Sequence, residues 1–355
     1  MINARAALLL GTCLLLACGD RGDHHVASDA APVARTMSPM PTDTAWIRGG
    51  SKDDLPLVYP DYMGHDGTRV YVSDQVTHAV TAFDQATGKT AWVTNPNTSV
   101  LKNPAAMSGL PGGGVAVIDG ASQGLVLLSA KGAVARVVPL NEAATARQVC
   151  ALSDSAFLLA VPRTRFPLVM IDVNGRTLSR QDLPWLEARE LTPMQTQVLM
   201  TSAGDGQCAV ALAYGGGLAL VGQEGAAWRS PYVEGTPLPV LKVTKEERAG
   251  VERVSSKVVA SHVSVLDIAA SDSTIEVAFD GETPDRGKLV DAYSLKTGKY
   301  VMTWKSDRRV VGFQETPTRI FALTGWKGYP ALVALARHFS HVTSAPRPIA
   351  DAANR

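Results

Sequence analysis

The sequence has little of what marks several common classes of protein. Aromatic residues make up 6% and charged residues 19% of its 355 positions, and the formal net charge is +1. A nearly neutral chain has no overall electrostatic attraction to nucleic acid, so no nucleic-acid partner is expected. Four cysteines occur, without paired C-x-x-C, H-E-x-x-H or EF-hand spacing. The chain therefore shows no sequence motif for a bound metal.

The apolar run at the N terminus is too short to cross a membrane. It extends from Ala6 to Ala17, about twelve residues against the roughly 20 that a spanning helix needs, and Arg5 precedes it. This pattern predicts an export signal over residues 1–17. The run ends in Leu15-Leu16-Ala17-Cys18, which resembles the lipobox of bacterial lipoproteins. The resemblance implies a lipid on Cys18 that attaches the protein to a membrane.

The predicted anchor also gives an expected location. Gly19 rather than aspartate follows Cys18, which for a bacterial lipoprotein implies the outer membrane. We therefore expect the protein in the bacterial cell envelope, facing the periplasm. Residues 18–43 are polar, contain proline and show no periodicity, so they are predicted to be a disordered tether. Residues 346–355 are predicted to be a disordered tail.

Between these ends the sequence contains a repeat. The chain has 31 glycines and 21 prolines, which suits short strands and tight turns. Apolar strands recur, each preceded by a turn signal such as His65-Asp66-Gly67. Their anchor residues are Val70, Val115, Phe157, Ala209, Ile275 and Ile320. A period of about 45 residues with four strands per unit is typical of a β-propeller. The fold is therefore predicted to be all-β, a six-bladed β-propeller over residues 44–345 with four short antiparallel strands per blade.

Two features of this propeller are predicted in more detail. Residues 236–257 have a charged middle that interrupts the strand pattern, so they are interpreted as an insertion between blades 4 and 5, either partly helical or a disordered loop. The strand around Ala45–Arg48 is expected to complete the last blade beside Leu332–Arg337. Closing the ring with an N-terminal strand removes an exposed sheet edge.

One turn has a recognisable sequence motif. Gly88-Lys89-Thr90-Ala91-Trp92 is similar to the quinoprotein repeat, and residues 298–304 are a looser copy. The chain as a whole resembles the TolB-like and NHL-like group of six-bladed bacterial propellers, with repeats similar to the outer-membrane barrel-assembly propeller lipoprotein. The resemblance implies that Trp92 and Trp304 pack between blades. Quinone-binding propellers usually have eight blades and a calcium site, so no cofactor is expected.

Two classes of function remain, and the sequence favours the first. A lipid anchor joined to a propeller predicts a binding or assembly scaffold whose partner is an envelope protein or a polysaccharide. Aromatic residues in loops are enriched at binding hot spots, so the turn that contains Trp326, Lys327 and Tyr329 is predicted to be the contact surface. Arg163 and Arg165 lie in the equivalent turn of blade 3 and are predicted to extend it on the same rim.

The second class is an enzyme. Six-bladed lactonases and lyases assemble a metal site around the central tunnel, and they act on a lactone, ester or similar small substrate. Candidate ligands near the expected innermost strands are Asp61, His65, Asn103, Asn141, Asp267 and Glu315. No catalytic constellation occurs in the sequence, so no catalytic residue is assigned. Cys150 and Cys208 lie in adjacent blades, either as a disulfide or as two buried thiols.

Overall fold

A computed structural model describes residues 34–51, 57–95, 97, 100–163, 165–183, 192, 194–234, 236–248, 251–281 and 284–337. The predicted signal peptide, Cys18 and the predicted C-terminal tail lie outside these residues. Within them, no helix has the length and apolar character needed to span a membrane.

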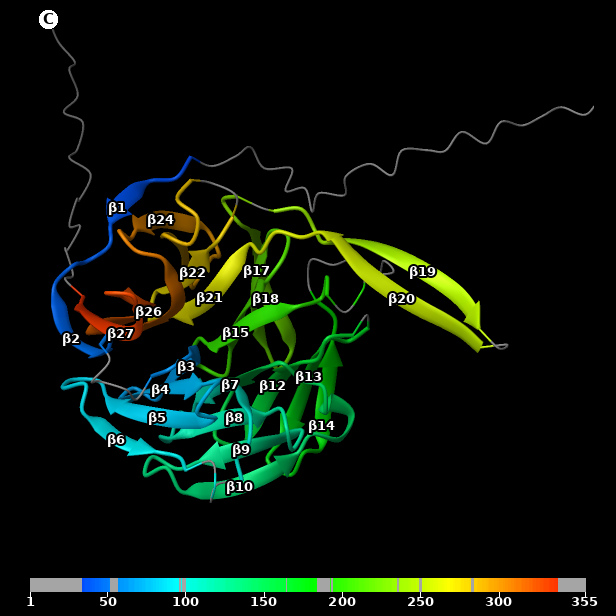
Figure 1. Cartoon of the computed structure of the whole chain (residues 1–355), viewed down its shortest axis with the longest axis horizontal. Helices are drawn as coiled ribbons and strands as arrows, with labels where there is room; N and C mark the ends of the chain where they lie inside the picture. Colours follow the sequence, from blue (N-terminus) through cyan, green and yellow to red (C-terminus); the bar gives the residue numbers. More distant parts are fainter. Residues whose placement is uncertain are drawn as a thin grey trace, which may run out of the picture.

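The chain folds into a ring of six antiparallel sheets, which confirms the predicted six-bladed propeller (Figure 1). Blades 1 to 3 consist of β3 (Pro60–His65), β4 (Arg69–Asp74), β5 (Ala79–Asp84), β6 (Thr90–Val93), β7 (Pro104–Gly109), β8 (Val115–Asp119), β9 (Gly124–Leu128), β10 (Val134–Pro139), β11 (Gln148–Ala151), β12 (Ala156–Ala160), β13 (Leu168–Asp172) and β14 (Thr177–Gln181), with η1 (Asn141–Ala143) between blades 2 and 3. Blades 4 to 6 consist of β15 (Val198–Ser202), β16 (Cys208–Leu212), β17 (Gly217–Gly222), β18 (Gly225–Pro231), β21 (Val265–Ala270), β22 (Thr274–Phe279), β23 (Leu289–Ser294), β24 (Tyr300–Lys305), β25 (Val310–Glu315), β26 (Arg319–Trp326) and β27 (Tyr329–Ala336), completed by the N-terminal strand β2 (Thr44–Gly49).

Burial explains why this sequence needs a ring. The six anchor residues of the sequence repeat lie on the second strand of each blade and are fully buried. The six hydrophobic clusters each join residues of two neighbouring blades, so the core of the molecule is divided among the six seams between blades. A single blade cannot bury both of its faces, and each seam supplies the missing cover.

Three seams contain the same tryptophan contact, which explains the glycines of the sequence repeat. The pairs are Trp46 with Gly88, Trp92 with Gly132, and Trp228 with Gly298. In each pair the indole lies so close that a Cβ on the glycine would meet the ring at 2.5 to 2.6 Å. Each indole N–H also donates a hydrogen bond of 2.9 or 3.0 Å to a backbone carbonyl of the next blade. Trp304 packs on Phe313 of blade 6, so the predicted packing of Trp92 and Trp304 between blades is confirmed.

The N-terminal segment closes the ring, as predicted. β2 pairs antiparallel with β27, and Trp46 lies opposite Ala334. The predicted start of the domain at residue 44 was too late, however, because β1 (Met37–Pro39) adds a parallel strand to the outer edge of blade 5. Arg35 is held there by Asp291 at 2.9 Å and Glu234 at 2.6 Å. The polar composition of this segment hid an ordered strand, since its backbone pairs with β24 whatever the side chains are.

The insertion between blades 4 and 5 lies where it was predicted but has a different structure. It is neither partly helical nor a loop: β19 (Val240–Arg248) and β20 (Val251–Ala260) form a two-stranded antiparallel hairpin that projects from the disc (Figure 1). Both strands contain β-branched valines, which favour extended backbone even where charges interrupt the pattern.

Cys150 and Cys208 form a disulfide, which decides the alternative that the sequence left open. Cys150 lies on β11 of blade 3 and Cys208 on β16 of blade 4, with their Cα atoms 6.2 Å apart. Both residues are fully buried in the cluster that fills this seam. The seam between blades 3 and 4 is thus joined covalently.

Candidate functional site

The predicted contact turn is a tight hairpin on one face of the disc. Lys327 and Gly328 both have positive φ, 49° and 86°, and they connect β26 to β27. This face also carries the connections from one blade to the next, because the strands of each blade alternate in direction; we call it the connection face. Lys327 and Tyr329 are exposed there, and Tyr329 is 44% exposed. These two residues are therefore available to a partner.

Trp326 occupies a different environment from its neighbours. Its indole is half-buried, and the Arg308 guanidinium stacks on it 3.8 Å from the ring centroid. On its other side, a Cβ added to Gly50 would lie 3.0 Å from the indole. Trp326 thus folds back onto the end of β2 and onto the connection between blades 5 and 6, and keeps part of its surface exposed.

Below Trp326 lies a groove in the seam between blades 5 and 6, with a volume of about 320 Å³. Its floor consists of Val310, Val333 and Leu335, and the N-terminal residues around Met40 form one side. We call it the seam groove. Lys305 and Arg308 stand at its edge, so an apolar interior has a cationic border. The same short segment that closes the ring therefore also shapes this groove.

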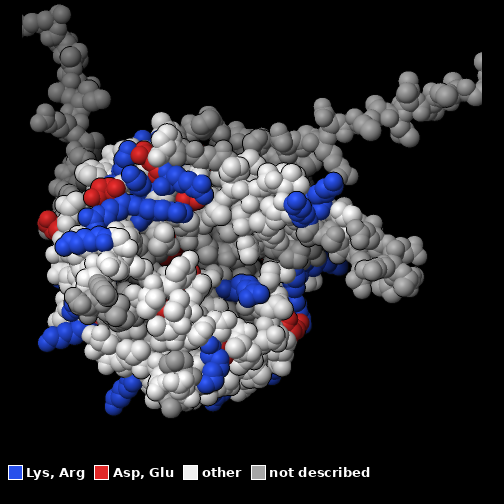
Figure 2. Space-filling view, in the orientation of Figure 1, with Lys and Arg blue, Asp and Glu red and all other residues white. Residues whose placement is uncertain are grey.

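Positive charge gathers around the seam groove. Figure 2 shows lysine and arginine side chains concentrated over the part of the disc that blades 5 and 6 occupy in Figure 1, with some acidic residues among them. Arg286 and Arg309 are more than half exposed, although both reach the buried carboxylate of Asp280. Lys305 pairs with Asp285 at 2.7 Å. The cations are thus fixed in place by acids beneath or beside them, and the outward surface is basic.

Arg163 and Arg165 lie in the equivalent turn of blade 3, as predicted, but not beside Trp326. Blades 3 and 6 are half a ring apart. Arg163 donates a 2.8 Å hydrogen bond to the Phe166 carbonyl, and the exposed Arg165 stacks over the Phe166 ring at 5.5 Å. They share the connection face with Trp326, and the structure does not bring them into one site with it.

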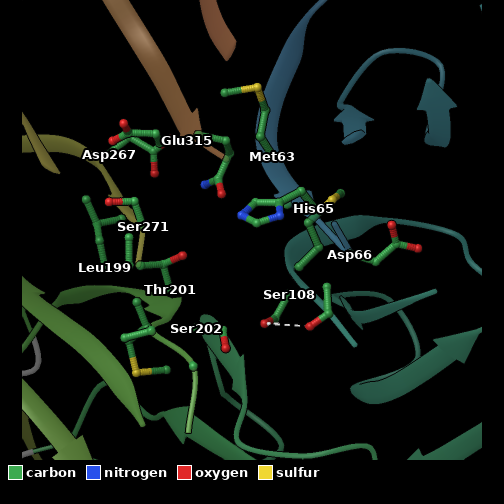
Figure 3. Close-up of a pocket in the computed structure, with 18 of the residues that line it drawn as sticks. Met63, His65, Asp66, Ser108, Leu199, Thr201, Ser202, Asp267, Ser271 and Glu315 are labelled. Atoms are coloured by element: carbon green, nitrogen blue, oxygen red, sulfur yellow. Dashed lines mark hydrogen bonds between the residues drawn. The ribbon is translucent and has the colours of Figure 1, made fainter. Parts of the chain in front are cut away.

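The second hollow is the central tunnel, which has a volume of about 630 Å³. The innermost strands line it, together with the turns that follow β3, β7, β15 and β21, so it opens on the face opposite the connection face. Figure 3 shows Asp267, Glu315 and Ser271 on one wall, and His65 and Met63 reaching toward them from another. The tunnel is the place where a propeller enzyme would assemble its ligands.

Four of the six residues considered for an enzyme line the tunnel: Asp61, His65, Asp267 and Glu315. The other two do not. The Asn141 amide donates to the Gly175 carbonyl at 3.3 Å, and Asn103 lies against Gly120 in a turn. Within the described ranges, no group of three or more His, Cys, Asp or Glu side chains is placed to hold a metal ion.

Burial controls the protonation of the tunnel carboxylates. Burial raises the pKa of Asp267 to about 7, and the negative charge of Asp61 adds to this effect. Two backbone N–H groups oppose it, from Phe313 at 2.7 Å and Ile268 at 2.9 Å. Burial also raises the pKa of Asp61, against a hydrogen bond from Gln75. These two carboxylates therefore act as a pair that disfavours double ionisation.

Three further ionisable groups of the tunnel are engaged or neutral. The Asp66 carboxylate points away from the cavity (Figure 3) and accepts hydrogen bonds from Tyr71 and from the Gly114 backbone. Burial lowers the pKa of His65, so its ring is neutral at pH 7. Glu315 lies beside Glu276, and the Arg337 Nε is 2.7 Å from the Glu315 carboxylate. Burial raises the pKa of both glutamates. Asp205 and Asp272 also line the tunnel, as exposed residues of the turns after β15 and β21, so Asp61 and Asp267 are the carboxylates that lie deeper in it.

Sequence reasoning missed the cations of the seam groove and the polar lining of the tunnel. The run Lys305-Ser306-Asp307-Arg308-Arg309 was a visible signal, because three cations fall within five residues between two predicted blades. Gln148 and Gln314 gave no such signal, since single glutamines on apolar strands are distinguished only by where the strands meet.

Comparison with known proteins identifies no family. No family model and no curated protein matches the chain. Solved structures do match, among them streptogramin B lyase, with 12% identity and a TM-score of 0.49 over 82% of this chain and 97% of that one. Virginiamycin B lyase from Staphylococcus aureus has 10% identity and a TM-score of 0.48 over 82% and 99%. BamB from Moraxella catarrhalis has 14% identity and a TM-score of 0.43 over 86% and 98%. At these identities the likeness concerns the β-propeller fold alone.

Proposed function

We propose that the protein is a lipid-anchored protein of the bacterial cell envelope whose propeller is a binding module for a partner protein. The observation that supports this is the seam groove, an apolar hollow with a cationic border on the connection face. The anchor is proposed at Cys18, and the outer membrane facing the periplasm is the proposed location. The N-terminal segment that leads from Cys18 forms one side of the groove, so a bound partner would be held near the membrane.

The chemistry of the groove identifies the kind of partner. Val310, Val333 and Leu335 offer an apolar floor, and the exposed part of Trp326 adds an aromatic wall. An apolar side chain buried there would gain the usual stabilisation of burial, about 25 cal/mol per Å². Lys305 and Arg308 would attract carboxylates on either side of it. The groove therefore fits an acidic peptide segment with one large apolar residue.

A polysaccharide is the competing partner, and an affinity experiment separates the two. The protein is purified from membranes, and the mass of its N-terminal peptide establishes whether Cys18 bears the lipid. The envelope proteins that bind the wild type are then compared with those that bind the variants. Trp326→Ala should weaken capture by more than about 1 kcal/mol and leave the melting temperature nearly unchanged, because the indole is half exposed. Arg308→Glu should weaken it further by charge repulsion.

A matched control is available in the equivalent turn of blade 3. Arg165→Glu makes the same charge change on the connection face half a ring away and should leave capture unaltered. An unmodified Cys18 in the mature chain would contradict the proposed anchor. Capture that is unchanged by Trp326→Ala and Arg308→Glu would place the binding surface elsewhere, and retention of purified envelope polysaccharide instead of protein would contradict the proposed partner.

A further inference from the structure

The central tunnel combines features that the seam groove does not have. Its lining includes the carboxylates of Asp61 and Asp267, and no lysine or arginine occurs among the described residues that line it. A volume of about 630 Å³ lies in the range of pockets that bind small molecules, roughly 300–1,000 Å³. The tunnel is thus large enough for a ligand and negative in character.

Buried polar groups without partners are the second, independent observation. Gln314 is 4% exposed and Gln148 is 8% exposed, and both side chains line the tunnel. Neither amide makes a hydrogen bond to any residue that the structure describes. The Nδ1 atom of His65 is likewise buried and unpaired with the described part of the chain. A buried atom such as His65 Nδ1 costs about 1–3 kcal/mol when it is left unpaired, and the two amides face the tunnel without a partner among the described residues.

The lining also has an apolar component. Met63, Met107 and Met200 come from three different blades; each packs in a hydrophobic seam cluster and also lines the cavity. Methionine is flexible and polarisable, so it adapts to ligands of varied shape. A purely hydrated inorganic ion would make no use of these side chains.

We propose that the tunnel binds a small organic cation, an amine or guanidine with an apolar portion, whose charged group lies against Asp61 and Asp267. The like charges of these two carboxylates repel each other in the empty tunnel, and a cation between or beside them removes that repulsion. The polar atoms of Gln148 and Gln314 supply hydrogen-bond acceptors for its N–H groups, and the methionines cover its apolar part. This site is separate from the seam groove and does not depend on its partner.

The test uses the full-length protein and titration calorimetry with defined probes. These are phenethylamine, agmatine and spermidine, with neutral 2-phenylethanol as the matched control for phenethylamine, and Ca²⁺ and Mg²⁺ alone. At least one organic cation should bind, and 2-phenylethanol should not. Asp61→Asn and Asp267→Asn should each weaken that cation by about tenfold, since each removes one charge from the binding pair. Asp307→Asn changes the same charge at the border of the seam groove and should alter the affinity less than about twofold.

A fourth variant tests the site without removing a carboxylate, in case the aspartate variants fail to fold. Gln314→Leu keeps the size and burial of the side chain but removes its polar atoms, and should weaken the cation by about fivefold. The proposal is overturned if no organic cation binds, or if 2-phenylethanol binds as tightly as phenethylamine. It is also overturned if only Ca²⁺ or Mg²⁺ binds, or if the folded aspartate variants retain the wild-type affinity. Should both aspartate variants unfold, the charged and neutral probes and Gln314→Leu still decide the question.

Discussion

The seams between blades 3 and 4 and between blades 5 and 6 are held together by different means. The first contains the buried disulfide Cys150–Cys208 within a cluster of buried hydrophobic side chains. The second is covered on its outside by the N-terminal segment and crossed on its inside by the hydrogen bond from Phe313 to Asp267. One seam contains a covalent bond, whereas the other is non-covalent and includes a buried carboxylate whose pKa is raised.

This difference indicates which part of the ring can respond to a partner. The N-terminal segment that covers the seam between blades 5 and 6 also lines the seam groove. Asp267, at the inner end of the same seam, lines the tunnel. Both proposed sites therefore touch the same adjustable seam. The disulfide fixes a seam two positions away around the ring, so binding that shifts blade 5 against blade 6 need not open the seam between blades 3 and 4.

Removing the closing strand should have the largest effect. Deletion of residues 44–50 removes the pairing of β2 with β27 and the buried Trp46. Loss of a buried tryptophan and of several ladder hydrogen bonds should together lower the free energy of unfolding by at least about 5 kcal/mol. Equilibrium unfolding in urea measures this. A midpoint that stays at the wild-type value would mean that β2 does not close the ring in solution.

Breaking the covalent seam should have a smaller effect. The disulfide closes a loop of 58 residues, and replacing both cysteines by alanine should lower the free energy of unfolding by about 4 kcal/mol. Wild-type protein in a thiol reductant should then unfold at the same midpoint as the double variant. Equal stability of oxidised wild type and double variant would show that the bond contributes nothing to this seam.

Much of the fold was predictable from the sequence because it rests on local spacing. Each anchor strand follows a turn, and a repeat of about 45 residues leaves little choice but a propeller. Trp92 was also predictable, since its distance from Gly88 is part of the repeat. The hairpin at 240–260 and the strand at 37–39 were not predicted, because their backbone pairing is not encoded by alternating apolar residues.

The sites were less predictable than the fold, for a geometric reason. The turn at Trp326 could be found because its aromatic residues and lysine are adjacent in sequence. The tunnel combines Asp61, Gln148 and Gln314 from three different blades, and the register that makes them neighbours appears only once the ring is closed. The disulfide was undecidable in the same way, since two buried cysteines on adjacent blades fit a bond or two thiols equally well.

The last and smallest expected effect is on the dependence of stability on pH. Asp267 has a pKa of about 7 in the folded protein because it is buried, against an ordinary value of 3.8. Its protonated form is therefore favoured by folding, and that contribution is complete below about pH 4 and is lost as the pH rises to 7. Between pH 5 and pH 8 the wild type should lose about 2 kcal/mol that Asp267→Asn does not lose.

Urea unfolding of the wild type and of Asp267→Asn at pH 5 and pH 8 measures this difference. Two control variants test whether the difference arises at Asp267. Asp307→Asn is the charge-matched control and should keep the wild-type pH dependence, because its side chain is 81% exposed. The double cysteine variant should keep it as well, since the disulfide lies in a different seam from Asp267. If Asp267→Asn and the wild type lose the same stability, Asp267 is ionised throughout, and the seam between blades 5 and 6 responds to pH through Glu276 and Glu315 instead.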